Sequence, residues 1–218
     1  MKKARVLIVF VCVMAVVICT VCMPVRAQLI TIAITGQVSS VTDAGGLDGK
    51  IHIGDSVIGT YTYNSAVPDL DPCSIWGRYE NTSPPAGIWL ECGGFDFRTD
   101  PCNVRFVIGV ENGTPGVNPW ADNYHIESYN NLPLSNGRLL NVISWSLIDL
   151  TKTALSSDAC PTTAPDFSKW GDRDTLLIDG MRGGEFRIGV NVTSTTLIPE
   201  PATLLLLGFG AFVLSKRK

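Results

Sequence analysis

Basic residues are scarce between the two ends of the chain. Residues 28–198 contain ten Lys and Arg residues against nineteen Asp and Glu residues, a formal charge of −9, whereas the whole chain of 218 residues stands at −3. Nucleic acids and anionic lipid surfaces are bound mainly through clustered Lys and Arg side chains. This stretch is therefore not expected to bind either of them, and its composition fits a soluble extracellular domain.

The same stretch lacks the local motifs of common enzyme classes. It contains no Gly-x-Ser-x-Gly nucleophile turn, no phosphate-binding loop and no dinucleotide fingerprint. It also has no Cys-x-x-Cys pair of the kind that holds zinc or exchanges disulfides. Because no catalytic motif is visible, we expect a protein that is not an enzyme.

The N-terminal end has the pattern of a secretory signal peptide. A basic start (residues 2–5) precedes an apolar run over residues 6–22, and small residues then stand at the −3 and −1 positions of a cleavage site between Ala27 and Gln28. We therefore predict a signal peptide over residues 1–27 that directs the chain to the Sec translocon. Because the apolar run is long for a signal peptide, an uncleaved anchor is the alternative.

Three features follow one another at the C-terminal end: a Pro-Glu-Pro motif, an apolar run over residues 202–214 and a basic cluster. The motif is Pro199, Glu200 and Pro201, and the cluster is Lys216, Arg217 and Lys218. The two prolines bar a helix from continuing through the motif and keep the backbone open to a peptidase. The apolar run is shorter than the about 20 residues that span a bilayer, and the basic cluster is expected to stay cytoplasmic. This order predicts a membrane anchor that is later processed, with a plain tail anchor as the alternative.

Residues 199–218 resemble the PEP-CTERM sorting signal, because all three features occur in the order found in that family. The resemblance implies recognition by an exosortase, a membrane cysteine peptidase, in a Gram-negative bacterium that makes extracellular polysaccharide. It also implies an exported precursor that is held transiently in the inner membrane through residues 202–214. Processing near the Pro-Glu-Pro motif would then leave the protein at the cell surface or outside the cell.

Export would permit disulfides in the stretch between the two ends. The cysteines of that stretch are Cys73, Cys92, Cys102 and Cys160. An even number of cysteines in an exported chain predicts two disulfides, with three possible connectivities. Cys92 and Cys102 flank two turns and would meet across neighbouring strands, which leaves Cys73 for Cys160.

Short strand-like runs separated by Gly, Pro, Asn and Asp fill residues 28–198. The runs cover residues 29–41, 57–63, 88–91, 95–99, 104–110, 124–129, 139–150 and 185–192. Their β-branched and aromatic residues favour strands, and a Gly-Gly pair between the third and fourth runs predicts a hairpin. Residues 151–170 are expected to form a long loop. We predict an all-β fold with a single β-sandwich domain of jelly-roll type. Residues 54–63 and 128–134 resemble β-sandwich domains carried by PEP-CTERM proteins.

Several side chains are candidates for ligand contact. Trp76 and Trp120 lie among turn residues, so their indoles are expected to be exposed and able to stack on sugar rings. Trp89 and Trp145 are expected in the core, where aromatic side chains bury large areas. A carbohydrate is therefore a candidate ligand.

Metal binding is less defined in this sequence. His125 and Glu127 are two residues apart and would lie on one face of a strand, as a metal or acid–base pair or as an ordinary surface pair. Paired loop carboxylates such as Asp69 and Asp71 can supply oxygen ligands to calcium, although turn formation also explains them. A structural calcium ion is the one cofactor that the sequence allows, and no metal ligand can be assigned.

Together these patterns predict a signal peptide (1–27), an extracellular β-sandwich domain (28–198) and a sorting signal (199–218). The protein is expected to act at the cell surface or in the extracellular matrix, with a structural or adhesive role in exopolysaccharide or biofilm. A carbohydrate-binding module that uses exposed Trp or Tyr side chains is the alternative, and a glycan-active enzyme is a third hypothesis.

Overall fold

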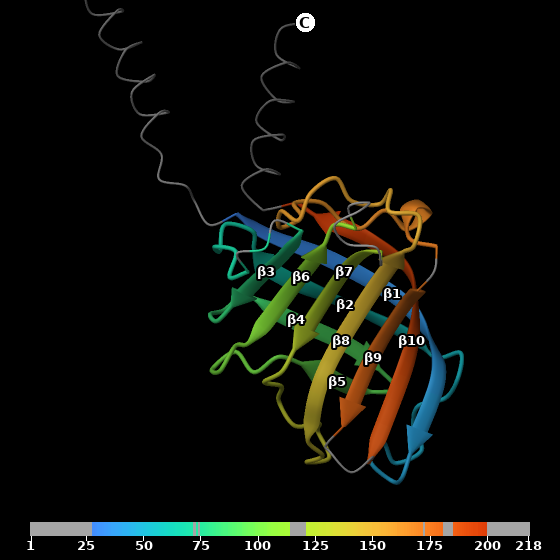
Figure 1. Cartoon of the computed structure of the whole chain (residues 1–218). Coiled ribbons are helices and arrows are strands. Elements are labelled where there is room, and N and C mark those ends of the chain that lie inside the picture. Colours follow the sequence, from blue (N-terminus) through green and yellow to red (C-terminus); the bar gives the residue numbers. More distant parts are fainter. Residues whose placement is uncertain are drawn as a thin grey trace, which may run out of the picture.

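The structure is a computed structural model of the chain, and it describes residues 28–71, 73, 75–113, 121–171, 173–180 and 185–199 (Figure 1). The predicted signal peptide, with Ala27, lies outside these residues and remains a prediction. Glu200, Pro201, the apolar run and the basic cluster also lie outside the described residues. Within the described residues, no helix has the length and apolar character needed to cross a membrane.

The described residues form ten β-strands and one short 3-10 helix. The strands are β1 (Leu29–Asp43), β2 (Ser56–Asn64), β3 (Trp76–Asn81), β4 (Gly87–Cys92), β5 (Phe95–Arg98), β6 (Phe106–Glu111), β7 (Asp122–Ser128), β8 (Leu140–Asp149), β9 (Arg173–Gly180) and β10 (Phe186–Ile198), and the helix η1 is Phe167–Lys169. Neighbouring strands are antiparallel and form one continuous sheet in the order β3-β6-β7-β8-β9-β10-β1-β2-β4-β5.

The sheet curls until its two halves face each other. In Figure 1, β3, β6, β7, β8, β9 and β10 lie in front of β1, β2, β4 and β5. Side chains of the two halves meet between them: the Tyr124 hydroxyl on β7 donates to the Tyr61 hydroxyl on β2 at 3.0 Å. Phe97 on β5 lies 6.4 Å from Phe186 on β10, measured between ring centres. One hydrophobic core therefore fills the inside of the curl.

Alternation along each strand produces this inside and outside. On β1, Ile30, Ile32 and Ile34 are buried while the residues between them are partly exposed. Successive side chains of a strand point to opposite faces, so a period of two places one set of residues in the core and leaves the other set on the outer face. The outer face is where polar side chains gather, and it carries the candidate site.

The all-β prediction is confirmed, but the described strands form one curled sheet rather than the two separate sheets of a sandwich. The reason lies in β1, which is 15 residues long and pairs with β10 along one edge and with β2 along the other. These pairings carry the hydrogen bonding from one half to the other without a break. The predicted hairpin is β4–β5, and residues 151–170 form the predicted loop apart from η1.

The predicted disulfides are not found in this structure: the four cysteines all lie within the described residues and are free thiols there. Cys92 is buried at the turn end of the β4–β5 hairpin, opposite Phe95. Cys102 is exposed and follows the opposite end of the same hairpin, so the two turns that suggested this bridge hold the thiols apart. Cys73 is exposed and Cys160 is half-buried, and these two are not bonded either.

Candidate functional site

A hollow of about 550 Å³ lies on the outer face of β3, β6 and β7. We call it the β3–β6–β7 trough and define it by Trp76 and Arg78 on β3, Gly109 and Glu111 on β6, Asn123, His125 and Glu127 on β7, and Tyr129 just after β7. Cross-strand pairing explains why these residues meet. Trp76 stands opposite Glu111, Arg78 stands opposite Gly109, and Gly109 in turn stands opposite His125.

Gly109 makes room for the His125 side chain. A Cβ atom added at Gly109 would overlap the His125 imidazole, so this ring lies directly over the glycine backbone. His125 and Glu127 lie on the same outer face of β7, as their spacing predicted. The imidazole therefore occupies the space above Gly109 and forms part of the floor of the trough.

A chain of charged and aromatic contacts forms one side of the trough. The Glu80 carboxylate accepts hydrogen bonds from Arg78 at 3.2 Å and from Arg105 at 3.3 Å. The Arg105 guanidinium lies 4.7 Å from the centre of the Tyr129 ring, a cation–π contact. The Tyr129 hydroxyl donates to Glu127. Partial burial, this hydrogen bond and the negative charge of Glu127 raise the pKa of Tyr129 to about 12, so the phenol stays neutral.

His125 is held in its neutral form at physiological pH. Burial lowers the pKa of His125; the carboxylates of Glu127 and Glu111 act in the opposite direction, and the nearby Arg78 adds to the lowering. A neutral imidazole keeps one nitrogen as a donor and the other as an acceptor of hydrogen bonds. The trough therefore offers donors and acceptors of both kinds rather than a field of one sign.

Trp76 supplies the aromatic surface at the rim of the trough. It is the first residue of β3, on the outer face of an edge strand, and 48% of its accessible surface remains exposed. An exposed indole beside several hydrogen-bonding side chains suits a ligand that has both an apolar face and a ring of hydroxyl groups. A pyranose sugar has this character.

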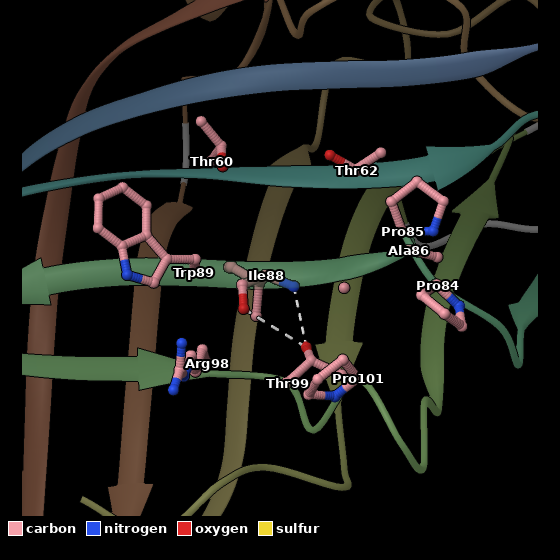
Figure 2. Close-up of a pocket in the computed structure, with 11 residues that line it drawn as sticks. Thr60, Thr62, Pro84, Pro85, Ala86, Ile88, Trp89, Arg98, Thr99 and Pro101 are labelled. Carbon is pink, nitrogen blue, oxygen red and sulfur yellow. Dashed lines mark hydrogen bonds between the residues drawn. The ribbon is translucent and has the colours of Figure 1, made fainter. Parts of the chain in front are cut away.

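A second hollow, of about 280 Å³, lies on the outer face of the other half of the sheet. Thr60 on β2, Trp89 on β4 and Arg98 on β5 form a row across it, because they stand opposite one another in the sheet (Figure 2). The Trp89 indole N–H donates to Asp96 at 2.9 Å. Trp89 is 36% exposed, so its predicted place in the core is wrong: its position on β4 faces outward.

The other predicted residues are placed as follows. Trp145 is buried in the core as expected, and Trp120 lies outside the described residues. Within the described part of the chain, no group of three or more His, Cys, Asp or Glu side chains is placed to hold a metal ion. Asp69, which was considered for calcium, accepts hydrogen bonds from the backbone N–H groups of Asp71 and Arg78 at 2.9 and 2.8 Å, which is a turn-forming role. Tyr129 is a trough residue that spacing along the sequence did not reveal.

Comparison with curated proteins and with solved structures found no match. Residues 197–218 match the family model described as the PEP-CTERM protein-sorting motif. The match covers Pro199, Glu200 and Pro201, the apolar run and the basic cluster, and it implies an exported, membrane-anchored precursor that an exosortase processes. The chain therefore carries the C-terminal sorting motif of the PEP-CTERM proteins, as the order of its three C-terminal features predicted.

Proposed function

We propose that the processed protein is a non-enzymatic, adhesive component of the cell surface or extracellular matrix and that the β3–β6–β7 trough binds an extracellular polysaccharide. The sorting motif supports export. The excess of acidic residues argues against nucleic acid and anionic lipid as partners. The observation that carries the proposal is the half-exposed Trp76 at the rim of a trough lined with neutral and charged hydrogen-bonding groups.

The chemistry of the trough matches a sugar ring better than it matches a purely apolar ligand. A pyranose stacks its C–H face on an indole and presents hydroxyl groups around its edge. Asn123 and His125 offer donors and acceptors, and Glu127 offers carboxylate oxygens, all within the same hollow as Trp76. Ligand sites commonly combine an apolar contact surface with a few polar groups of this kind.

The contribution of Trp76 follows from its exposed surface. A Trp side chain can bury about 200 Å², so the 48% that remains exposed corresponds to roughly 100 Å². A sugar stacked on one face of the indole would cover about half of this exposed area. At about 25 cal/mol per Å² the contact is worth ~1.3 kcal/mol, which is about a ten-fold change in Kd.

Sedimentation of the mature protein with extracellular polysaccharide from its own producing cell tests the proposal. Trp76→Ala is expected to weaken binding about ten-fold. Trp89→Ala is the matched control, because Trp89 is also a partly exposed indole but lies on the other half of the sheet. Equal binding by wild type and Trp76→Ala would count against the trough. If binding is lost in Trp89→Ala but kept in Trp76→Ala, the polysaccharide binds at the second hollow instead.

The same material separates adhesion from catalysis. A non-enzymatic protein leaves the chain length of the polysaccharide unchanged during prolonged incubation. Release of oligosaccharides that disappears with Glu127→Gln would instead indicate a glycan-active enzyme, because carboxylates are the usual acids and bases of glycoside cleavage. The expected result is binding without turnover.

A further inference from the structure

The folded domain extends directly into the sorting signal. β10 runs to Ile198, and Pro199 is the first residue of the Pro-Glu-Pro motif. The family match itself begins at residue 197, within the strand. No linker therefore separates the sheet from the segment that the peptidase must recognise.

The last five residues of β10 are held differently from the rest of the strand. We call residues 194–198 the terminal segment of β10. A shift in register between Thr35 and Gly36 of β1 separates this segment from the part of β10 that ends at Val192. Val192 is buried in the core, whereas Leu197 is 39% and Ile198 is 42% exposed. The terminal segment is attached mainly through its backbone pairing with β1 and one hydrogen bond, from the Thr195 hydroxyl to the Pro165 carbonyl.

Detachment of this segment leaves the remainder of the sheet in place. β1 pairs with β2 along its other edge, from Leu29 to Gln37. Its inward residues Ile30, Ile32 and Ile34 stay buried in the core. The terminal segment can therefore separate from β1 without removing a core side chain or exposing both edges of β1.

The peptidase and β1 compete for the same backbone groups. A processing enzyme binds an extended segment through the main-chain N–H and C=O groups on either side of its recognition motif. Pro199 and Pro201 have no N–H group, so the nearest backbone donors before the motif belong to the terminal segment of β10. In the folded domain this segment pairs with β1, where Thr196 stands opposite Ala33 and Ile198 opposite Thr31, so alternate N–H and C=O groups of the segment are turned towards β1. A cleft that binds both edges of the segment needs these groups as well.

We propose that the terminal segment of β10 (residues 194–198) is part of the surface recognised by the exosortase and must separate from β1 before the sorting motif is processed. The inference rests on the proposed processing at that motif. The terminal segment fits a peptidase cleft that binds an extended strand. Processing is thereby coupled to a local opening of the finished domain, whose core remains closed.

A cross-strand disulfide tests the proposal in the full-length precursor expressed in its native cell. Ala33→Cys with Thr196→Cys joins the terminal segment to β1, since these residues stand opposite each other. Gln37→Cys with Asn191→Cys is the matched control, because these residues also stand opposite each other on the outer face, but Asn191 precedes the register shift in β10. Mass spectrometry first confirms each new disulfide, and pulse–chase labelling then follows C-terminal processing.

The first pair is expected to slow processing at least ten-fold, with recovery on mild reduction, while the control pair is processed at the wild-type rate. Processing of the verified first pair at the wild-type rate would overturn the proposal. An eight-residue Gly-Ser insertion between Ile198 and Pro199 adds about 26 Å of reach and places unpaired main-chain groups directly before the motif. Because the segment is recognised through its main chain, the insertion is expected to restore processing of the disulfide-bonded protein. Persistent failure would show that the disulfide blocks processing in another way and would overturn the proposal. If the wild-type precursor itself is not processed, the proposed function fails instead, because it is assigned to the processed protein.

Discussion

The hydrogen bond between Tyr61 and Tyr124 provides a direct test of the curled sheet. Tyr61 lies on β2 and Tyr124 on β7, in the two facing halves, and both side chains are fully buried. The Tyr124 hydroxyl donates to the Tyr61 hydroxyl at 3.0 Å. Burial raises the pKa of both phenols well above the usual range, so the bond joins two neutral groups at all ordinary pH values.

Removal of one hydroxyl leaves its partner buried without that bond. Tyr61→Phe and Tyr124→Phe are each expected to lower the free energy of unfolding by about 1–3 kcal/mol. The double variant is expected to lie closer to wild type than the sum of the single effects, because no unsatisfied hydroxyl remains. For a domain of this size, 1 kcal/mol corresponds to a shift in Tm of roughly 2–4 °C.

Urea unfolding of wild type, both single variants and the double variant completes the thermodynamic cycle. Ile58→Val serves as a control on the outer face of β2, where Ile58 is 47% exposed and a single substitution usually changes stability by less than about 0.5 kcal/mol. A coupling energy of about 1 kcal/mol or more is expected between Tyr61 and Tyr124. Strictly additive effects would show that the two halves of the sheet do not face each other as described.

Two further predictions concern the loop after β8 and the floor of the trough. Burial alone would raise the pKa of Asp149, but hydrogen bonds accepted from Thr151 and Thr153 outweigh it and hold the pKa at about 2. The stability that this carboxylate contributes is therefore present above the ordinary carboxyl pKa and is lost as the pH falls towards 2. Asp149→Asn is expected to lower the free energy of unfolding by roughly 1–3 kcal/mol at pH 7. Urea unfolding at several pH values is expected to show a smaller loss of stability at low pH in this variant than in wild type. Gly109→Ala is expected to push the His125 imidazole out of its place and weaken polysaccharide sedimentation several-fold at unchanged stability, and unchanged binding would contradict the assigned floor of the trough.

The sequence was informative where the alternation of apolar residues was strong. The runs at 29–41 and 139–150 are long and rich in β-branched and aromatic residues, and they became β1 and β8. β3 was missed because only Tyr79 of its residues 76–81 faces the core as a large hydrophobic side chain, beside Gly77 and charged neighbours. β9 was missed because charged residues and Gly180 frame a short apolar stretch.

The candidate site depended on contacts that are distant along the chain. His125 and Glu127 could be placed on one face of a strand from their spacing alone. Their meeting with Trp76 and Arg78 depends on the register of β3, β6 and β7, which no local pattern specifies. The same limit applied to the disulfides, because Cys92 and Cys102 are near in sequence but lie at opposite ends of one hairpin.

The intact mass of the protein recovered from its native cell tests the central claim most directly. The account predicts a species that has lost both the residues before Gln28 and the C-terminal segment beyond the sorting motif. It also predicts that Glu200→Ala blocks the second loss, because the motif that the peptidase recognises is damaged. A wild-type protein that retains residues 199–218 throughout would contradict the account and would identify the tail as a permanent membrane anchor.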